Sequence, residues 1–130
     1  MKREDALQKA VARLLDSMGL DWFHPANGEA RNAITGAKLK AFGVKAGVPD
    51  CMIFTLSDVR GAVGELLPGM GHPLAIELKA PDAKGKRPKP RPNQLDWHDR
   101  LRRNGWRVDV CYNIDEVLAV LRECYPGMVR

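Results

Sequence analysis

Residues 74–79 read Leu-Ala-Ile-Glu-Leu-Lys, the most informative segment of the chain. Its composition predicts a strand, and successive side chains of a strand point to opposite faces of a sheet. The apolar residues Leu74, Ile76 and Leu78 are therefore expected on one face. Glu77 and Lys79 are expected side by side on the other, about 6–7 Å apart along the strand. Taken alone, these two charges are typical of a solvated face with a weak ion pair.

A second strand is expected over 48–54, with Asp50 at the end where Pro49 enters it. Taken alone, Asp50 is a turn residue before a strand. If the two strands pair, Asp50 and Glu77 lie one strand spacing apart, about 4.8 Å. Two carboxylates so close repel each other unless one takes a proton or a cation lies between them, and hard oxygen ligands favour Mg²⁺ or Mn²⁺. Lys79 would then stand beside the ion, where it can hold a water or a phosphate oxygen.

The rest of the chain alternates helical and extended patterns. The expected elements are a helix over 4–18, a strand at 20–24, a loop with a short helix in 29–47, the strands 48–54 and 74–80 on either side of an irregular connection at 57–72, a helix over 93–104, a strand over 107–112 and a last helix after Asn113. Leu95 and Leu101 are expected to face inward, and Asn113 with Glu116 forms a capping-box-like start. The order predicts a single α/β domain over 1–130, a small mixed β-sheet flanked by helices.

The composition excludes several classes of protein. The chain has 130 residues, of which 45% are hydrophobic and 28% charged, as expected for one globular domain. No apolar run approaches the roughly 20 residues of a membrane helix, and the start has no signal-peptide pattern. Cys51, Cys111 and Cys124 have no short spacing and are expected to be reduced core residues of a cytoplasmic protein. Together with the histidines they form no zinc pattern.

The positive charge is concentrated in one part of the chain. Residues 79–107 contain ten basic and three acidic residues, whereas the net charge of the whole chain is +5. Such a concentration suits a polyanion, with nucleic acid as the first candidate. Within it, the proline-rich tract 84–92 cannot be helical and is expected to be an extended, mobile loop. The alternative is a solvated loop with no partner.

Several short motifs follow one another in a fixed order. They are Glu4-x3-Gln8, Pro25-Ala26-Asn27-Gly28, Gly43-x3-Gly47-Val48-Pro49-Asp50, Ile76-Glu77-Leu78-Lys79, and Gln94-x2-Trp97 followed by Leu101 and Gly105. This set resembles the VRR-NUC branch (virus-type replication-repair nucleases) of the PD-(D/E)XK nucleases. The resemblance extends from Glu4 to the final helix and implies a restriction-endonuclease-like core.

The resemblance also implies a role for each matching residue. It implies that Asp50 and Glu77 bind Mg²⁺ or Mn²⁺, with the carbonyl of Leu78 as a further ligand. Lys79 would orient or activate water, and Glu4 would bind the ion directly or through water. Gln94 would help to place water or phosphate. For Glu4 the alternative is a favourable charge in the first turn of a helix. For Gln94 it is a surface amide.

A DNA-binding surface is expected next to this site. The candidates are Lys84, Lys86, Arg87, Lys89 and Arg91, followed by Lys45 and Asn27 and, more weakly, Lys38 and Lys40. Phosphate contacts of this kind position a substrate without reading its sequence. Trp97 and Trp106 are expected in the core or an interface.

The residues and the resemblance together predict a divalent-metal-dependent DNA endonuclease. The family resemblance points to branched replication and repair intermediates such as Holliday junctions. One active site per chain suggests a homodimer for cutting two strands. The expected location is the cytoplasm of a bacterium or of a phage-infected host cell. The alternatives are a catalytically silent DNA-binding module, an accessory protein of the same fold, and a restriction-type endonuclease.

Overall fold

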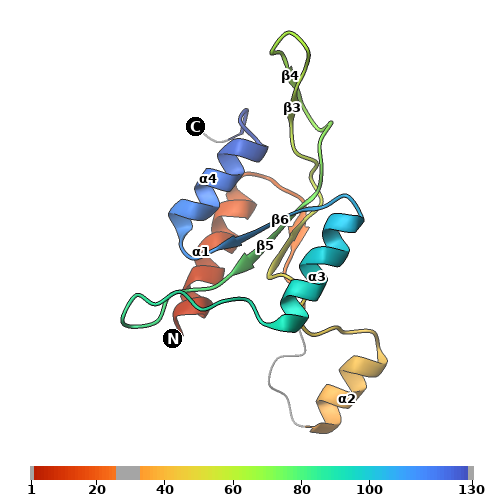
Figure 1. The fold of residues 1–130 in the computed structure, drawn as a ribbon, viewed down its shortest axis with the longest axis vertical. Helices are drawn as coiled ribbons and strands as arrows, with labels where there is room; N and C mark the ends of the chain where they lie inside the picture. The colour runs from red at the N-terminus through yellow and green to blue at the C-terminus, as the bar shows by residue number, and fades with distance from the viewer. Residues whose placement is uncertain (1, 26–32, 129–130) are drawn as a thin grey trace.

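The computed structural model describes residues 2–25 and 33–128. Figure 1 shows the arrangement of its helices and strands. In chain order they are α1 (Arg3–Ser17), β1 (Trp22–Phe23), α2 (Ala33–Ala41), β2 (Cys51–Ile53), β3 (Val59–Arg60), β4 (Leu66–Leu67), β5 (Leu74–Leu78), α3 (Pro92–Arg103), β6 (Arg107–Cys111) and α4 (Ile114–Cys124). Every element expected from the sequence is present in the expected order, although the strands are shorter than predicted.

The main sheet is mixed and has the strand order β1-β2-β5-β6. β1 pairs with β2, and β2 with β5, in antiparallel fashion, whereas β5 and β6 are parallel. A parallel pair needs a crossover connection, and α3 lies in the one between β5 and β6. The prediction of a small mixed sheet flanked by helices is confirmed.

Different helices cover the two faces of this sheet (Figure 1). Leu74 and Leu78 pack in the larger core with apolar side chains of α1 and α4. Ala75 packs in the smaller core with Leu101 of α3. The predicted alternation along β5 is therefore confirmed, but every residue of this strand is buried. Glu77 is only 2% exposed, which excludes the interpretation of a solvated charged face.

The helix α3 begins one residue before its predicted start. Leu101 is buried as expected, but the prediction for Leu95 is wrong because its side chain is 48% exposed. Successive residues of a helix are about 100° apart, so Leu95 cannot share the inward face with its neighbour Gln94. The inward positions are taken instead by the polar side chains of Gln94 and His98.

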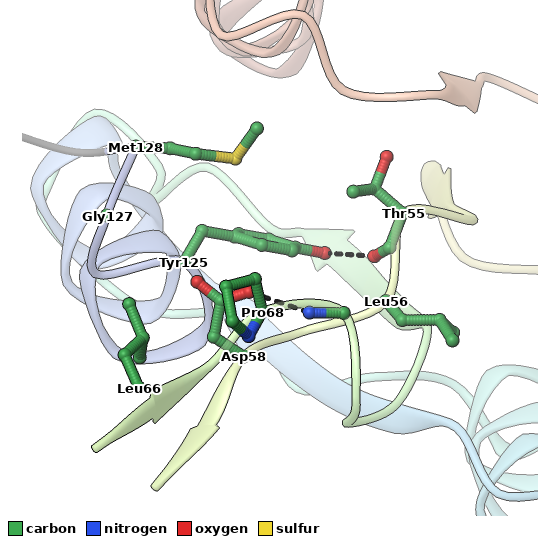
Figure 2. A pocket seen from close by; sticks show the side chains of 9 residues that line it. Thr55, Leu56, Asp58, Leu66, Pro68, Tyr125, Gly127 and Met128 are labelled. Carbon is green, nitrogen blue, oxygen red and sulfur yellow. Dashed lines mark hydrogen bonds between the residues drawn. The ribbon is translucent and has the colours of Figure 1, made fainter.

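The connection 57–72 is more regular than expected, because it contains the antiparallel pair β3 and β4. A pocket of about 480 Å³ lies between this hairpin and the residues that follow α4 (Figure 2). Tyr125 spans it and donates a hydrogen bond from its hydroxyl to the carbonyl of Thr55, at 2.7 Å. On the hairpin, the carboxylate of Asp58 accepts a hydrogen bond from the N–H of Gly69. Each of these strands has only two residues and lies close to glycines, so no alternation of apolar and polar residues can be recognised. The sequence therefore did not predict them.

The cap of α4 forms as predicted, with one difference. The side chain of Asn113 accepts a hydrogen bond from the N–H of Glu116 at 2.9 Å. The Glu116 carboxylate accepts in return from the N–H of Tyr112, one residue before the expected partner. This reciprocal pair satisfies two main-chain donors near the start of the helix.

The three cysteines are buried and unpaired, as expected. Burial raises the pKa of Cys51 and of Cys111 to about 12, so both are thiols at neutral pH. Within the described ranges, no helix is long and apolar enough to cross a membrane.

Candidate active site

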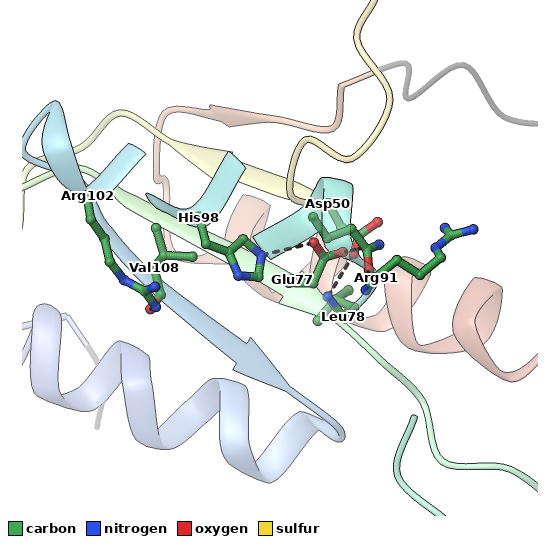
Figure 3. Close-up of polar contacts among 8 residues, drawn as sticks. Asp50, Glu77, Leu78, Arg91, His98, Arg102 and Val108 are labelled. Carbon is green, nitrogen blue, oxygen red and sulfur yellow. Dashed lines mark hydrogen bonds and ion pairs between the residues drawn. The ribbon is translucent and has the colours of Figure 1, made fainter. Parts of the chain in front are cut away.

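The pairing of β2 with β5 brings Asp50 and Glu77 together. Cys51 lies opposite Ile76, so continuing the antiparallel register by one residue places Asp50 opposite Glu77. The Asp50 carboxylate accepts a hydrogen bond from the N–H of Leu78, with 2.7 Å between Oδ2 and N. Figure 3 shows the two carboxyl groups side by side on the face of the sheet that α3 covers. The predicted pairing of the two strands is confirmed.

The electrostatics of this pair are those of two like charges taken out of water. Burial, with the neighbouring Glu77 carboxyl, raises the pKa of Asp50 to about 7. Burial also raises the pKa of Glu77. Two such close, buried carboxyl groups titrate as a pair, and each makes ionisation of the other less favourable. Without a cation, the site therefore resists carrying two negative charges.

Lys79 and Glu4 belong to the same cluster of charges. Lys79 is 8% exposed and lies two residues after Glu77, so the alternation of an extended segment puts both side chains on one face. Burial raises the pKa of Glu4, in the first turn of α1; the charge of Lys79 opposes this increase and that of Asp50 adds to it. These effects place Glu4 within electrostatic range of the carboxylate pair, although α1 lies far from β2 and β5 in the sequence.

Gln94 lies at the site but does not have the exposed position of a surface amide. It is 6% exposed, and its Nε2 lies 3.4 Å from Oε2 of Glu77. Its own amide oxygen accepts a hydrogen bond from the N–H of Arg91 at 2.8 Å, which helps to start α3. Gln94 thus connects the beginning of the helix to the carboxylate.

The site also contains His98, which sequence reasoning missed. Its side chain is 2% exposed, and its Nε2 lies 3.3 Å from Oε1 of Glu77 (Figure 3). The signal that could have found it is the spacing from Gln94, because residues four apart lie on one face of a helix. Burial lowers the pKa of His98, so the ring is neutral at neutral pH.

The segment that leads into Asp50 is held by two close contacts. Gly47 has a φ of +90°, and a Cβ at this position would lie 2.8 Å from the carbonyl oxygen of Asn93. Only glycine allows this approach between the segment and the start of α3. On the other side, Nδ1 of His24 donates to the carbonyl oxygen of Asp50 at 2.7 Å.

The basic tract before α3 is not helical, as predicted, but its start is a turn and not extended chain, because the N–H of Gly85 donates to the carbonyl of Asp82 and the N–H of Asp82 to that of Lys86. Lys84, Lys86 and Lys89 are exposed. Its beginning is organised by Asp82, whose carboxylate accepts hydrogen bonds from the N–H groups of Lys84 and Lys86. Arg87 differs from the lysines because it is already engaged. Its guanidinium forms an ion pair with Glu116 at 2.6 Å and lies 4.7 Å from the centre of the Tyr112 ring.

The other candidate DNA contacts are less closely tied to the site. Arg91 is exposed, and its positive charge acts to lower the pKa of Glu77 against the larger effect of burial. Lys45 is exposed between α2 and Gly47. Asn27 lies outside the described residues. Trp97 and Trp106 pack against the smaller core, as predicted.

The chain is similar to a solved structure. The chain matches a structure described as "VRR_NUC domain protein" with a TM-score of 0.64 and 25% sequence identity, over 100% of this chain and 98% of that one. No protein-family model and no curated protein matches the chain. The match confirms the VRR-NUC resemblance and a nuclease-type fold.

Proposed function

We propose, from the assignment of this chain as a VRR-NUC domain, that it is a divalent-metal-dependent endonuclease that hydrolyses phosphodiester bonds in DNA. One observation carries the proposal. Asp50 and Glu77 face each other across two paired strands, with Lys79 on the same buried face. A protein that only binds DNA has no use for two adjacent buried carboxylates near phosphate, because their charges repel the ligand.

The donors present fit a hard divalent cation. Carboxylate oxygens are the ligands that Mg²⁺ prefers, and a cation offsets the repulsion that raises the pKa of Asp50. In the part of the chain that the structure describes, no group of three or more His, Cys, Asp or Glu side chains gathers to hold a metal. The proposed ligands are therefore Asp50, Glu77 and the carbonyl oxygen of Leu78, with water and substrate phosphate as the rest, as is usual for Mg²⁺.

Each residue has a distinct proposed task in hydrolysis. When bound, the ion lowers the pKa of a water ligand and withdraws charge from the phosphate. The ammonium of Lys79 orients the attacking water and stabilises charge on the phosphate oxygens. Glu4 would hold the ion, directly or through water. Gln94 holds the Glu77 carboxylate in place. This task is narrower than the placing of water or phosphate that the family resemblance implies.

The basic tract is the proposed contact for the DNA backbone. Lys84, Lys86 and Lys89 are exposed, and the tract connects the strand of Glu77 to the helix of Gln94. Phosphate contacts made there would fix the substrate relative to the carboxylates. Lys45 and Arg91 are proposed to extend the same surface.

We further propose that the protein acts on branched DNA as a homodimer, since one chain offers one such site. Light scattering with and without DNA tests the dimer, and a monomer in both would remove that part of the proposal. Equal cleavage of a linear duplex and a four-way junction would remove the preference for branched DNA.

The central experiment is cleavage of labelled duplex, single-stranded, splayed and four-way-junction DNA with Mg²⁺, Mn²⁺ or EDTA. Asp50→Ala and Lys79→Ala are compared with the wild type, and Arg13→Ala, an exposed cation near the far end of α1, is the matched control. Metal-dependent products that both site variants lose and the control keeps are expected. Band shifts without products in either metal would favour the silent DNA-binding or accessory module instead.

A further inference from the structure

His98 makes a buried side-chain contact with Glu77. It lies on α3 one turn after Gln94, and its Nε2 is 3.3 Å from Oε1 of Glu77. Both side chains are 2% exposed, so bulk water does not compete for this contact. In the ionised form that would bind a metal ion, Glu77 can only accept hydrogen bonds, so in that form Nε2 of His98 carries the hydrogen and donates it.

The two oxygens of Glu77 have separate partners on the same helix. Oε1 meets His98, whereas Oε2 meets Nε2 of Gln94 at 3.4 Å. The terminal torsion of a glutamate is broad and has no strong preference of its own. Two donors fixed on one rigid helix remove that freedom. A carboxylate has about four acceptor positions, so the remaining ones stay available on the side of Asp50.

We propose that His98 is a positioning residue that fixes the rotation of the Glu77 carboxylate, so that Glu77 and Asp50 meet a divalent ion together. The inference rests on the proposed nuclease function and adds a determinant of metal affinity that lies outside the ligands themselves. Groups that hold a ligating carboxylate by hydrogen bonds typically change metal affinity or activity by about 10- to 100-fold when removed.

A purely structural role for His98 predicts a different result. In that case any side chain that fills the same space would preserve metal binding. His98→Phe fills the space without a donor. His98→Gln keeps an N–H donor at a similar reach, and His98→Asn keeps the amide but is one methylene shorter. Leu101→Ala is the matched control, because Leu101 is buried one turn further along α3 and packs with the smaller core.

The test is calorimetric titration of Mn²⁺ into the full chain without DNA, with thermal unfolding in EDTA recorded for each variant. We expect His98→Phe and His98→Asn to weaken Mn²⁺ binding by about 10- to 100-fold and His98→Gln to retain it. Leu101→Ala should unfold at a lower temperature with unchanged Mn²⁺ affinity. The Mn²⁺ concentration for half-maximal cleavage should shift in parallel with the binding constants.

The outcomes separate this inference from the proposed function. Wild-type affinity in both His98→Phe and His98→Asn would overturn the positioning role and leave the nuclease intact. A loss in Leu101→Ala equal to that in His98→Phe would also overturn it, because general destabilisation would then explain both. If His98→Phe does not fold, the comparison of His98→Asn with His98→Gln decides. A wild-type protein that neither binds Mn²⁺ nor cleaves DNA would instead refute the function itself.

Discussion

The carboxylate of Asp50 is bound to the main chain of the strand that carries Glu77, through the 2.7 Å hydrogen bond from the N–H of Leu78. This contact fixes Asp50 beside the carboxyl group that repels it. The strand pairing therefore maintains an arrangement that the two charges alone would oppose. The conflict has consequences for stability, for the proposed binding of a metal ion and for the segment that leads into Asp50.

The first prediction concerns pH. The pKa of Asp50 is raised from 3.8 to about 7, so between these values the folded state binds more protons than the unfolded state. The stability that this proton contributes is fully present below the lower value and is lost as the pH rises through the upper one. In EDTA, wild type and Asp50→Asn should unfold at similar temperatures at about pH 5, and Asp50→Asn should be the more stable at about pH 8. A difference that does not depend on pH would contradict this.

The second prediction concerns Gly47. Gly47→Ala forces a non-glycine residue to a φ of +90° and brings its Cβ within 2.8 Å of the Asn93 carbonyl oxygen. Gly43→Ala is the matched control, because Gly43 has a φ of +99° but an added Cβ would meet nothing within 4 Å. Urea unfolding should show a loss of about 1–2 kcal/mol for the control, from backbone strain alone. Gly47→Ala should lose more stability and should also slow cleavage, whereas equal effects would show that the contact with Asn93 is unimportant.

The third prediction concerns the basic tract. If Lys84, Lys86 and Lys89 contact phosphates, each alanine variant should reduce the slope of log K against log salt concentration by about 0.9 for duplex DNA. Arg87→Ala should change the slope less, because its guanidinium is already paired with Glu116. Fluorescence anisotropy over a range of salt concentrations measures these slopes. An unchanged slope in all three lysine variants would mean that the tract does not contact DNA.

The fourth prediction separates stability from activity. Tyr125→Phe removes the hydrogen bond to Thr55 and leaves a carbonyl without its donor, which should cost about 1 kcal/mol in urea unfolding. The pocket beside Tyr125 is lined by Thr55 and other residues that follow the C-terminal end of β2. Asp50 lies at the other end of this strand, before Cys51. The cleavage rate at a temperature where both proteins are folded should therefore match that of the wild type. A slower rate would show that the hairpin region is coupled to the active site.

Much of this architecture follows from local patterns. The apolar segments around β2, β5 and β6 and the cap at Asn113 are readable because each is set by nearby residues. The pairing of Asp50 with Glu77 was also accessible as a hypothesis, since the two strands had only to be neighbours. Confirmation required the register of the sheet.

Other features depend on packing between segments that are distant in the sequence, so they could not be predicted from it. Glu77 is buried because helices cover both faces of the sheet, α3 on one face and α1 with α4 on the other. The apolar character of Leu95 predicts an inward position, but the inward face of α3 contacts the Glu77 carboxylate and is occupied there by Gln94 and His98. The ion pair of Arg87 with Glu116 joins residues 29 positions apart, for which the sequence offers no local signal.

For the proposed nuclease, the opposition of Asp50 and Glu77 makes activity a measure of correct strand alignment. A slip of one residue between β2 and β5 would place Pro49 or Cys51 opposite Glu77 and turn the two carboxylates to different faces of the sheet. Such a chain could keep its helices and much of its apolar packing and still have no site. Specific activity per molecule should therefore report the fraction of chains with the native alignment, which circular dichroism of a preparation would not distinguish.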